Sequence, residues 1–221
     1  MSFILSRRTL LAGTAALLAG PVLASAAPAS GALTADSIGR LFAPVPTGTV
    51  LPDLALDSEH GPKRLTDYRG KTLLVPLWAE WCADCLIEMG DLGTLQKRFG
   101  GAHFEVVPIL TNSKTMLDAG RAAFLLAKVG GGDLNGLIEA KGGSQLAKAV
   151  CRDASATPGQ DRFTLPCILL IDPHGRVVGR HIGLVLAPGS DPHAGKTIWS
   201  TPAAAAFCAA LASGAPPART A

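Results

Sequence analysis

The chain is organised around residues 72–85, which read Thr-Leu-Leu-Val-Pro-Leu-Trp-Ala-Glu-Trp-Cys-Ala-Asp-Cys. The first six of these residues are apolar and largely β-forming, which predicts a buried strand. After the second cysteine, apolar residues recur every three or four positions, as on one face of an amphipathic helix: Met89, Leu92, Leu95 and Phe99. The two cysteines therefore lie where a buried strand passes into a helix.

The position of this cysteine pair predicts redox chemistry. A cysteine at a helix N-terminus faces unpaired backbone N–H groups and the positive end of the helix dipole, and both favour the thiolate. Two intervening residues let the cysteines reach each other, with Cys82 as the exposed nucleophile and Cys85 as the more buried resolving thiol. The alternatives are a zinc half-site and a structural disulfide. Zinc would need two more ligands at comparable spacing, and the other cysteines and histidines stand singly.

The stretch around Trp81 resembles the Trp-Cys-x-x-Cys signature of the thioredoxin superfamily. More narrowly, it resembles the TlpA/ResA/CcmG group of exported thioredoxin-like reductases, whose motifs follow in order from about Pro52 to Leu211. The matching pieces are Pro52-x-Leu54-x-Leu56, the strand entry at 70–75, Cys85-x-x-Glu88-Met89, Leu165-Pro166 and residues 170–179. The resemblance implies an α/β, thioredoxin-like fold. Such a fold has a mixed central sheet flanked by helices, here with an N-terminal hairpin and a central strand–helix insertion.

The same resemblance implies three supporting residues. Leu165 and Pro166 match the segment that thioredoxin folds hold as a cis peptide beside the dithiol, where its backbone meets an incoming peptide. Glu88 matches an acid of the group's motif and is a candidate proton acceptor for the buried thiol. The alternatives are an ordinary strand-entry proline and a helix-surface charge. Glu80 is expected to be solvated.

Asp84 bears on the direction of electron flow. Many relatives have proline, and oxidants often have histidine, directly before the second cysteine. A carboxylate in the first helical turn suits the helix dipole but opposes a second negative charge on Cys82. A destabilised thiolate lowers the reduction potential, so the sequence predicts a reductant.

Two residues depart from the resembled group. Pro76 stands where thioredoxins have a buried aspartate and relatives often have asparagine. Because proline removes a ladder hydrogen bond, we expect a local irregularity in this strand. Gly90 replaces a proline that often follows Glu-Met in the helix, which we expect to soften any kink.

The rest of the chain predicts an alternation of strands and helices. We expect strands at 104–110, around 137–139 and at 168–171, a hairpin partner at 176–181, and helices at 145–150 and 203–211. Another helix is expected to be capped near Asn112 or Ser113, with Leu117, Phe124 and Ala127 on one face. The polar stretch 152–162 is interpreted as a loop, either a solvated connector or a substrate contact.

The domain boundaries follow from composition. Residues 1–26 combine Arg7-Arg8, an apolar run and a small-x-small cleavage site, and so resemble a twin-arginine export signal; a general secretory leader is the alternative. We predict a flexible linker at 27–49, the thioredoxin-like domain at 50–213 and a disordered tail at 214–221. Export places the mature protein in an oxidising compartment, the bacterial periplasm. It remains membrane-tethered there if the leader is not cleaved.

The charge of the chain excludes one class of partner. The formal net charge is +3 with no basic run, so we expect no nucleic-acid partner.

Three cysteines remain outside the Cys82–Cys85 pair. Cys151, Cys167 and Cys208 allow three pairings, among which the sequence does not choose. We interpret Cys167, in an apolar strand pattern, as a small buried apolar residue.

These observations together predict an exported thiol–disulfide oxidoreductase, a reductant of specific protein disulfides with no cofactor and no metal. By resemblance, its substrates are apocytochrome c or copper-site cysteines, and a membrane electron donor of the DsbD/CcdA kind recycles it; we expect a monomer. The alternative is a copper or haem accessory protein that holds Cu(I) with the same cysteines, near Met89. A peroxidase is disfavoured because the hydroxyl residue that those enzymes place before the cysteine is absent.

Overall fold

The computed structural model describes residues 33–45, 51–139, 143–152, 162–191 and 195–215, and these described residues belong to one compact unit. The predicted export signal at 1–26, residues 153–161 of the polar loop and most of the predicted tail lie outside the described residues. No helix in these ranges is both long and apolar enough to cross a membrane.

The centre of the fold is a seven-stranded mixed sheet in the order β1-β5-β4-β2-β6-β7, with β3 also paired to β2. Strand β2 runs parallel to β3 and β4 and antiparallel to β6, which is antiparallel to β7. The strands are β1 Leu56–Asp57, β2 Thr72–Trp78, β3 Phe104–Val106, β4 Ile109–Leu110, β5 Leu137–Glu139, β6 Cys167–Ile171 and β7 Val177–Ile182. The predicted mixed sheet is therefore present, with the dithiol strand β2 inside it.

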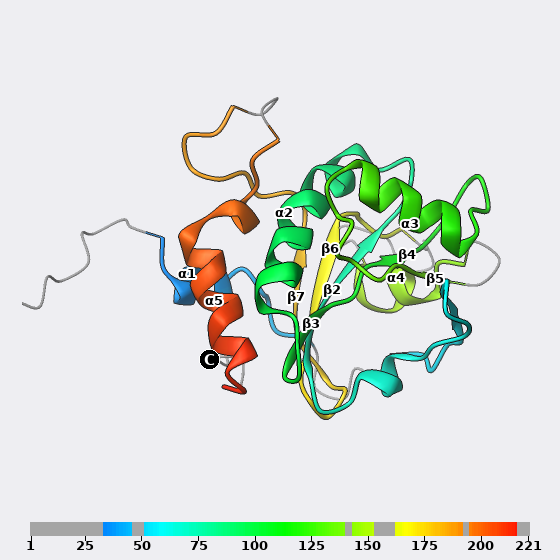
Figure 1. Cartoon of the computed structure of the whole chain (residues 1–221), viewed down its shortest axis with the longest axis horizontal. Helices are drawn as coiled ribbons and strands as arrows, with labels where there is room; N and C mark the ends of the chain where they lie inside the picture. Colours follow the sequence, from blue (N-terminus) through cyan, green and yellow to red (C-terminus); the bar gives the residue numbers. More distant parts are fainter. Residues whose placement is uncertain (1–32, 46–50, 140–142, 153–161, 192–194, 216–221) are drawn as a thin grey trace, which may run out of the picture. The chain divides into compact units, whose positions relative to one another are not determined.

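Helices cover both faces of this sheet (Figure 1). They are α1 Ala35–Gly39, α2 Ala83–Phe99, α3 Ala119–Lys128, α4 Gln145–Val150 and α5 Pro202–Ala212, with 3₁₀ turns η1 Leu65–Tyr68 and η3 Ile198–Ser200. Buried side chains of α1, α2, α3 and α5 pack together on one face. Those of α4 pack on the other, with η1 beside them. Strand β2 is buried along its whole length because its side chains alternate between these two cores.

Helix α2 carries the predicted apolar stripe, with Met89, Leu92 and Leu95 buried. Two glycines on α2 let the turn after α3 approach its backbone. A Cβ on Gly90 would lie 2.7 Å from the carbonyl oxygen of Val129, and one on Gly93 would lie 2.8 Å from the Cα of Gly131. Gly90, predicted only to soften a kink, is therefore required by the packing of α2.

The irregularity expected at Pro76 lies in the neighbouring strands. Pairing of β2 with β6 is continuous through Pro76, whereas the predicted strand 104–110 is split into β3 and β4 opposite it. The carbonyl oxygens of Leu74 and Trp78 both accept backbone hydrogen bonds from the β3–β4 side of β2. Because every second residue of a strand directs its backbone groups to the same side, the nitrogen of Pro76 also faces β3 and β4. Because that nitrogen has no hydrogen to donate, the ladder is interrupted there.

The predicted linker at 27–49 is wrong for residues 33–45. Thr34 caps α1, and Ile38 and Phe42 are buried in the same core as α5. Ala43 then exchanges backbone hydrogen bonds with Arg180 of β7. Apolar residues spaced four apart over a single short turn were enough to anchor this segment, although its surroundings are rich in Ala, Pro and Gly.

The helix predicted to begin near residue 112 begins later. Its N-cap is Asp118, whose carboxylate accepts the N–H of Arg121. Leu117 therefore precedes the helix, and Phe124 is 60% exposed, so the predicted apolar face is wrong. The buried residues of α3 are Ala122 and Leu126.

The remaining elements follow the sequence predictions closely. Strand β5 and helix α4 are present at the predicted insertion, and α5 begins at Pro202 with Thr201 as its cap. The predicted N-terminal hairpin is reduced to one bridge, in which Leu56 and Lys63 exchange backbone hydrogen bonds. Strand β1 instead pairs with β5.

Candidate redox site

Cys82 and Cys85 form a disulfide at the junction of β2 and α2. The S–S distance is 2.03 Å and the Cα atoms are 5.3 Å apart. Cys82 is the N-cap of α2, and its Sγ accepts the backbone N–H of Cys85 at 3.3 Å. Cys82 is 8% exposed and Cys85 is fully buried. Cys82 is therefore the more accessible member of the pair, although it is itself largely buried.

Trp81 forms an exposed wall next to Cys82. Its side chain is 42% exposed, and its Nε1–H donates to the carbonyl oxygen of Asn112 at 2.9 Å. The ammonium of Lys114 lies 4.5 Å from the centre of a Trp81 ring, a cation–π contact. The surface beside Cys82 is thus aromatic, with one cation at its edge.

Leu165 and Pro166 are joined by a cis peptide bond, as predicted. They lead directly into β6, where Cys167 pairs with Leu77 of β2. The segment therefore lies at the same end of β2 as the dithiol. Leu165 also packs against the core that contains Cys82 and Cys85.

Glu88 is fully buried on α2, one turn beyond Cys85. Its Oε1 accepts the indole Nε1–H of Trp199 at 3.1 Å, while its Oε2 has no partner among the described residues. The pKa of Glu88 is raised to about 8, chiefly because burial disfavours its charge; the hydrogen bond from Trp199 lowers the pKa, and the negative charges of Asp84 and Asp91 raise it. Of the two interpretations of Glu88, the helix-surface charge is therefore wrong: the residue lies in the core, and with a pKa of about 8 it is mostly protonated at pH 7.

The raised pKa of Glu88 makes stability depend on pH. Its folded value of about 8 lies above the ordinary value of 4.5, so the folded chain holds a proton that the unfolded chain releases between these values. The stabilisation is complete below pH 4.5 and is lost as the pH rises through about 8. Between roughly pH 5.5 and 7.5, unfolding free energy should fall by about 1 kcal/mol per pH unit more in the wild type than in Glu88→Gln.

Urea unfolding of both proteins in the disulfide form at several pH values measures this difference. Exchange of the exposed residue Glu59 for glutamine is the matched control and should leave the wild-type slope unchanged. Parallel pH profiles for the wild type and Glu88→Gln would show that Glu88 does not bind this proton.

Asp84 is exposed in the first turn of α2, between the two cysteines in sequence. No described hydrogen bond or ion pair from Asp84 reaches either cysteine. Its charge acts at a distance, since it contributes to the raised pKa of Glu88. Asp84 is therefore positioned to influence the site only electrostatically.

A second disulfide joins Cys151 at the end of α4 to Cys167 at the start of β6, with Cα atoms 6.1 Å apart. The interpretation of Cys167 as an apolar thiol is therefore wrong, although the residue is fully buried. Cys208 is the free cysteine, buried in α5, and burial raises the pKa of its thiol to about 12. Cys151, Cys167 and Cys208 are fully buried, whereas Cys82 keeps a small exposed fraction.

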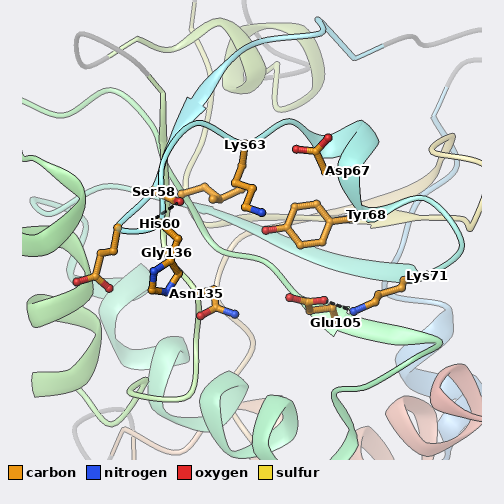
Figure 2. A pocket seen from close by; sticks show the side chains of 11 residues that line it. Ser58, His60, Lys63, Asp67, Tyr68, Lys71, Glu105, Asn135 and Gly136 are labelled. Atoms are coloured by element: carbon orange, nitrogen blue, oxygen red, sulfur yellow. Dashed lines mark hydrogen bonds and ion pairs between the residues drawn. The ribbon is translucent and has the colours of Figure 1, made fainter.

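A pocket of about 270 Å³ lies away from the dithiol (Figure 2). Lys71 and Glu105, which form an ion pair at 2.6 Å, lie at the opposite end of β2 from Trp78. In Figure 2 the Tyr68 ring lies between Lys63 and this ion pair. The lining residues carry mixed charges and include none of the predicted redox residues. Elsewhere too, no three His, Cys, Asp or Glu side chains of the described ranges are grouped to hold a metal ion.

Sequence reasoning missed two contributors to the site. Trp199, from η3 near the C-terminus, binds Glu88 across 111 positions of sequence. Glu80, expected to be solvated, instead accepts hydrogen bonds from residues 113–115. The hydroxyl-rich run Ser113–Thr115 was the available signal for Glu80, and it was misread as a helix cap.

A mixed sheet with a Cys-x-x-Cys pair at the N-terminus of the helix after its central strand, and a cis X–Pro segment at the same end, defines a thioredoxin-like fold with a dithiol site. The profile of the AhpC/TSA family matches residues 47–180, more than half of the chain. The chain belongs to this family.

Individual relatives match shorter segments. The chain is 35% identical over 66 residues to the thiol-disulfide oxidoreductase ResA of Geobacillus thermodenitrificans, covering 29% of this chain and 38% of that protein. It is 42% identical over 53 residues to the thiol:disulfide interchange protein DsbE of Pseudomonas fluorescens biotype C, covering 23% and 30%. These matches span well under half the length of either relative.

Two solved structures are also similar. One is a thiol:disulfide interchange protein from Bacteroides sp., with 23% identity, a TM-score of 0.46, and coverage of 62% of this chain and 81% of that one. The other is a thioredoxin family thiol:disulfide interchange protein from Chlorobium tepidum TLS, with 22% identity, a TM-score of 0.45, and coverage of 64% and 87%.

Proposed function

We propose that this chain is a thiol–disulfide oxidoreductase that reduces protein disulfides with Cys82 and Cys85. The observation that carries the proposal is the geometry of the pair: a partly accessible Cys82 at the N-cap of α2 and a fully buried Cys85 behind it. The N–H of Cys85 points at the sulfur of Cys82 and would stabilise a thiolate there once the disulfide is reduced. The similarity to ResA and DsbE segments supports the same chemistry.

The reaction consists of two exchanges. The Cys82 thiolate attacks one sulfur of the substrate disulfide, forming a mixed disulfide and releasing the other substrate sulfur as a thiolate that takes up a proton. Cys85, once deprotonated, attacks the sulfur of Cys82, and the second substrate sulfur leaves. The substrate gains two electrons and two protons, and Cys82–Cys85 becomes a disulfide.

We propose that the ionised form of Glu88, which is the minor form at pH 7, takes the proton of Cys85. An acid with a pKa near 8 is matched to a thiol at neutral pH, because a proton moves between groups of similar pKa with little cost. Its Oε2, which has no partner among the described residues, is the oxygen available for this proton. Trp199 holds the other oxygen and so orients the carboxyl group.

The proposed direction is reduction of the substrate, and Asp84 supports it. An exposed carboxylate in the first turn of α2 disfavours a thiolate on Cys82, which favours the disulfide form of the pair and lowers its reduction potential. Reduction of insulin by the reduced protein, followed as turbidity, tests the reaction itself. Absence of insulin reduction by fully reduced protein would contradict the proposal.

Asp84→His should raise the reduction potential by tens of millivolts, because it replaces a negative charge with a group that can be positive. Asp84→Asn is the matched variant, and it should shift the potential part of the way because it only removes the charge. Equilibration with glutathione buffers of known potential measures all three proteins. A wild-type potential as high as about −120 mV, in the range of strong periplasmic oxidants, would reverse the proposed direction.

The compartment and partners are proposed on sequence grounds. The twin-arginine-like segment at 1–26 supports export to the periplasm, with the thioredoxin-like domain beginning near residue 33 instead of residue 50. There a membrane donor of the DsbD/CcdA kind would return electrons to Cys82–Cys85. Apocytochrome c and copper-site cysteines are the proposed substrates, and the protein is proposed to act as a monomer.

A further inference from the structure

We propose that Glu80 is a positioning residue, whose carboxylate holds residues 112–115 beside the dithiol and thereby fixes the Trp81 surface against which a substrate peptide lies. The inference rests on the proposed disulfide exchange at Cys82. It assigns to Glu80 a part in substrate binding and no part in the electron transfer.

The carboxylate of Glu80 is the anchor of this segment. Its Oε1 accepts four hydrogen bonds, from the backbone N–H groups of Lys114 at 2.7 Å and Thr115 at 2.9 Å and from the hydroxyls of Ser113 and Thr115, both at 3.1 Å. Burial alone would raise the pKa of Glu80, but these hydrogen bonds hold it below its usual value. The acceptor is therefore charged at neutral pH, which strengthens each bond.

The anchored segment in turn orients Trp81. Within the described residues, both polar contacts of the Trp81 indole come from this segment: the Asn112 carbonyl oxygen at 2.9 Å and the Lys114 ammonium at 4.5 Å. Asn112 itself has a φ of +50°, a conformation that needs support from its surroundings. Among the described residues, every hydrogen bond that joins residues 113–115 to the β2–α2 junction ends on Glu80, and the cation–π contact of Lys114 with Trp81 is the other contact between them.

Loss of Glu80 should affect substrate binding and not the cysteine chemistry, because none of these contacts involves a cysteine. The N–H that points at Cys82 belongs to α2 and does not depend on residues 112–115. Trp81 is the large exposed side chain adjacent to Cys82, so a peptide that brings its disulfide to Cys82 must lie against it. Loss of Glu80 should therefore raise KM more than it lowers kcat.

Amide hydrogen exchange and steady-state kinetics test the inference together. In Glu80→Ala, exchange of the Lys114 and Thr115 amides should accelerate about tenfold or more, and KM for a synthetic peptide with one intramolecular disulfide should rise about tenfold, with kcat within about twofold. Glu80→Gln keeps an acceptor oxygen without the charge and should fall between. Glu59→Ala, an exposed glutamate away from the dithiol, is the matched control and should behave as the wild type.

The outcomes separate the two proposals. Unchanged exchange of both amides in Glu80→Ala would overturn the anchoring role, and faster exchange with an unchanged KM would overturn the role in binding. A changed reduction potential in Glu80→Ala would show that the residue acts on the cysteines instead. A wild-type protein that reduces no disulfide would overturn the proposed function and the binding role with it, while faster amide exchange would still support the anchoring.

Discussion

Replacing Cys82 with serine should lower the rate of disulfide reduction by about a thousandfold or more, because a serine hydroxyl does not ionise at neutral pH and forms no disulfide. Cys82 is the more exposed member of the pair and the N-cap of α2. Its loss therefore removes the thiol that a substrate reaches first. The measurement is insulin reduction, with the variant reduced beforehand and compared with the wild type at equal concentration.

Cys85→Ser should have a different effect, which identifies the order of the two thiols. Cys82 remains able to attack, but no second thiol resolves the mixed disulfide, so the variant should accumulate covalent adducts with its substrates. These adducts should appear on non-reducing gels and disappear with dithiothreitol. The double variant Cys82→Ser/Cys85→Ser should form none.

The free cysteine offers the matched control for both variants. Cys208 is buried in α5 and its thiol has a pKa of about 12, so Cys208→Ala should retain wild-type activity. Full activity of the Cys82→Ser variant would contradict the assigned roles. So would covalent adducts that form with Cys82→Ser and not with Cys85→Ser.

The parts of the fold that the sequence predicted are those governed by local pattern. The apolar run 72–77, the stripe beginning at Met89 and the Thr201–Pro202 cap each determine an element through neighbouring residues, and each element is present. The cysteine pair was predictable for the same reason, since its geometry is set within one helical turn. Local signals were therefore enough for the β2–α2 unit and its reactive centre.

The parts that the sequence did not predict depend on contacts between distant residues. Glu80 meets its partners 33–35 positions away, and the hydroxyl of Ser113 serves Glu80 instead of a helix, so the true cap of α3 is Asp118. Buried Glu88 likewise accepts its hydrogen bond from Trp199, which lies near the other end of the chain. From sequence alone, an acidic residue without local partners is interpreted as a surface charge, because its long-range partners are not visible.

The pairing of Cys151 with Cys167 is a further long-range feature, and its removal should have a large effect on stability. Both residues are fully buried in the core on the α4 face of the sheet. The bridge joins cysteines 16 positions apart and closes a segment that contains Leu165 and Pro166, just before Cys167. Closure of a loop of this length stabilises a folded chain by about 3 kcal/mol, because it restricts the unfolded chain.

The variant Cys151→Ala/Cys167→Ala should therefore lose about 3 kcal/mol of unfolding free energy, which corresponds to a fall in Tm of roughly 6–12 °C for a domain of this size. Thermal unfolding should be followed with Cys82–Cys85 in the disulfide form in both proteins, so that only one bridge differs. Cys208→Ala again serves as the control for loss of a buried sulfur. A Tm within about one degree of the wild type would show that the bridge does not hold this segment.

Burial also predicts the order in which the two disulfides are reduced. Both sulfurs of the second bridge belong to fully buried residues, whereas Cys82 is partly exposed, and an attacking thiolate must reach a sulfur to exchange with it. Mild dithiothreitol should therefore open Cys82–Cys85 while Cys151–Cys167 stays closed, as mass spectrometry after alkylation would report. This selectivity would let one protein keep a structural bridge while its reactive pair cycles between dithiol and disulfide. Simultaneous alkylation of all four cysteines in the folded protein would contradict it.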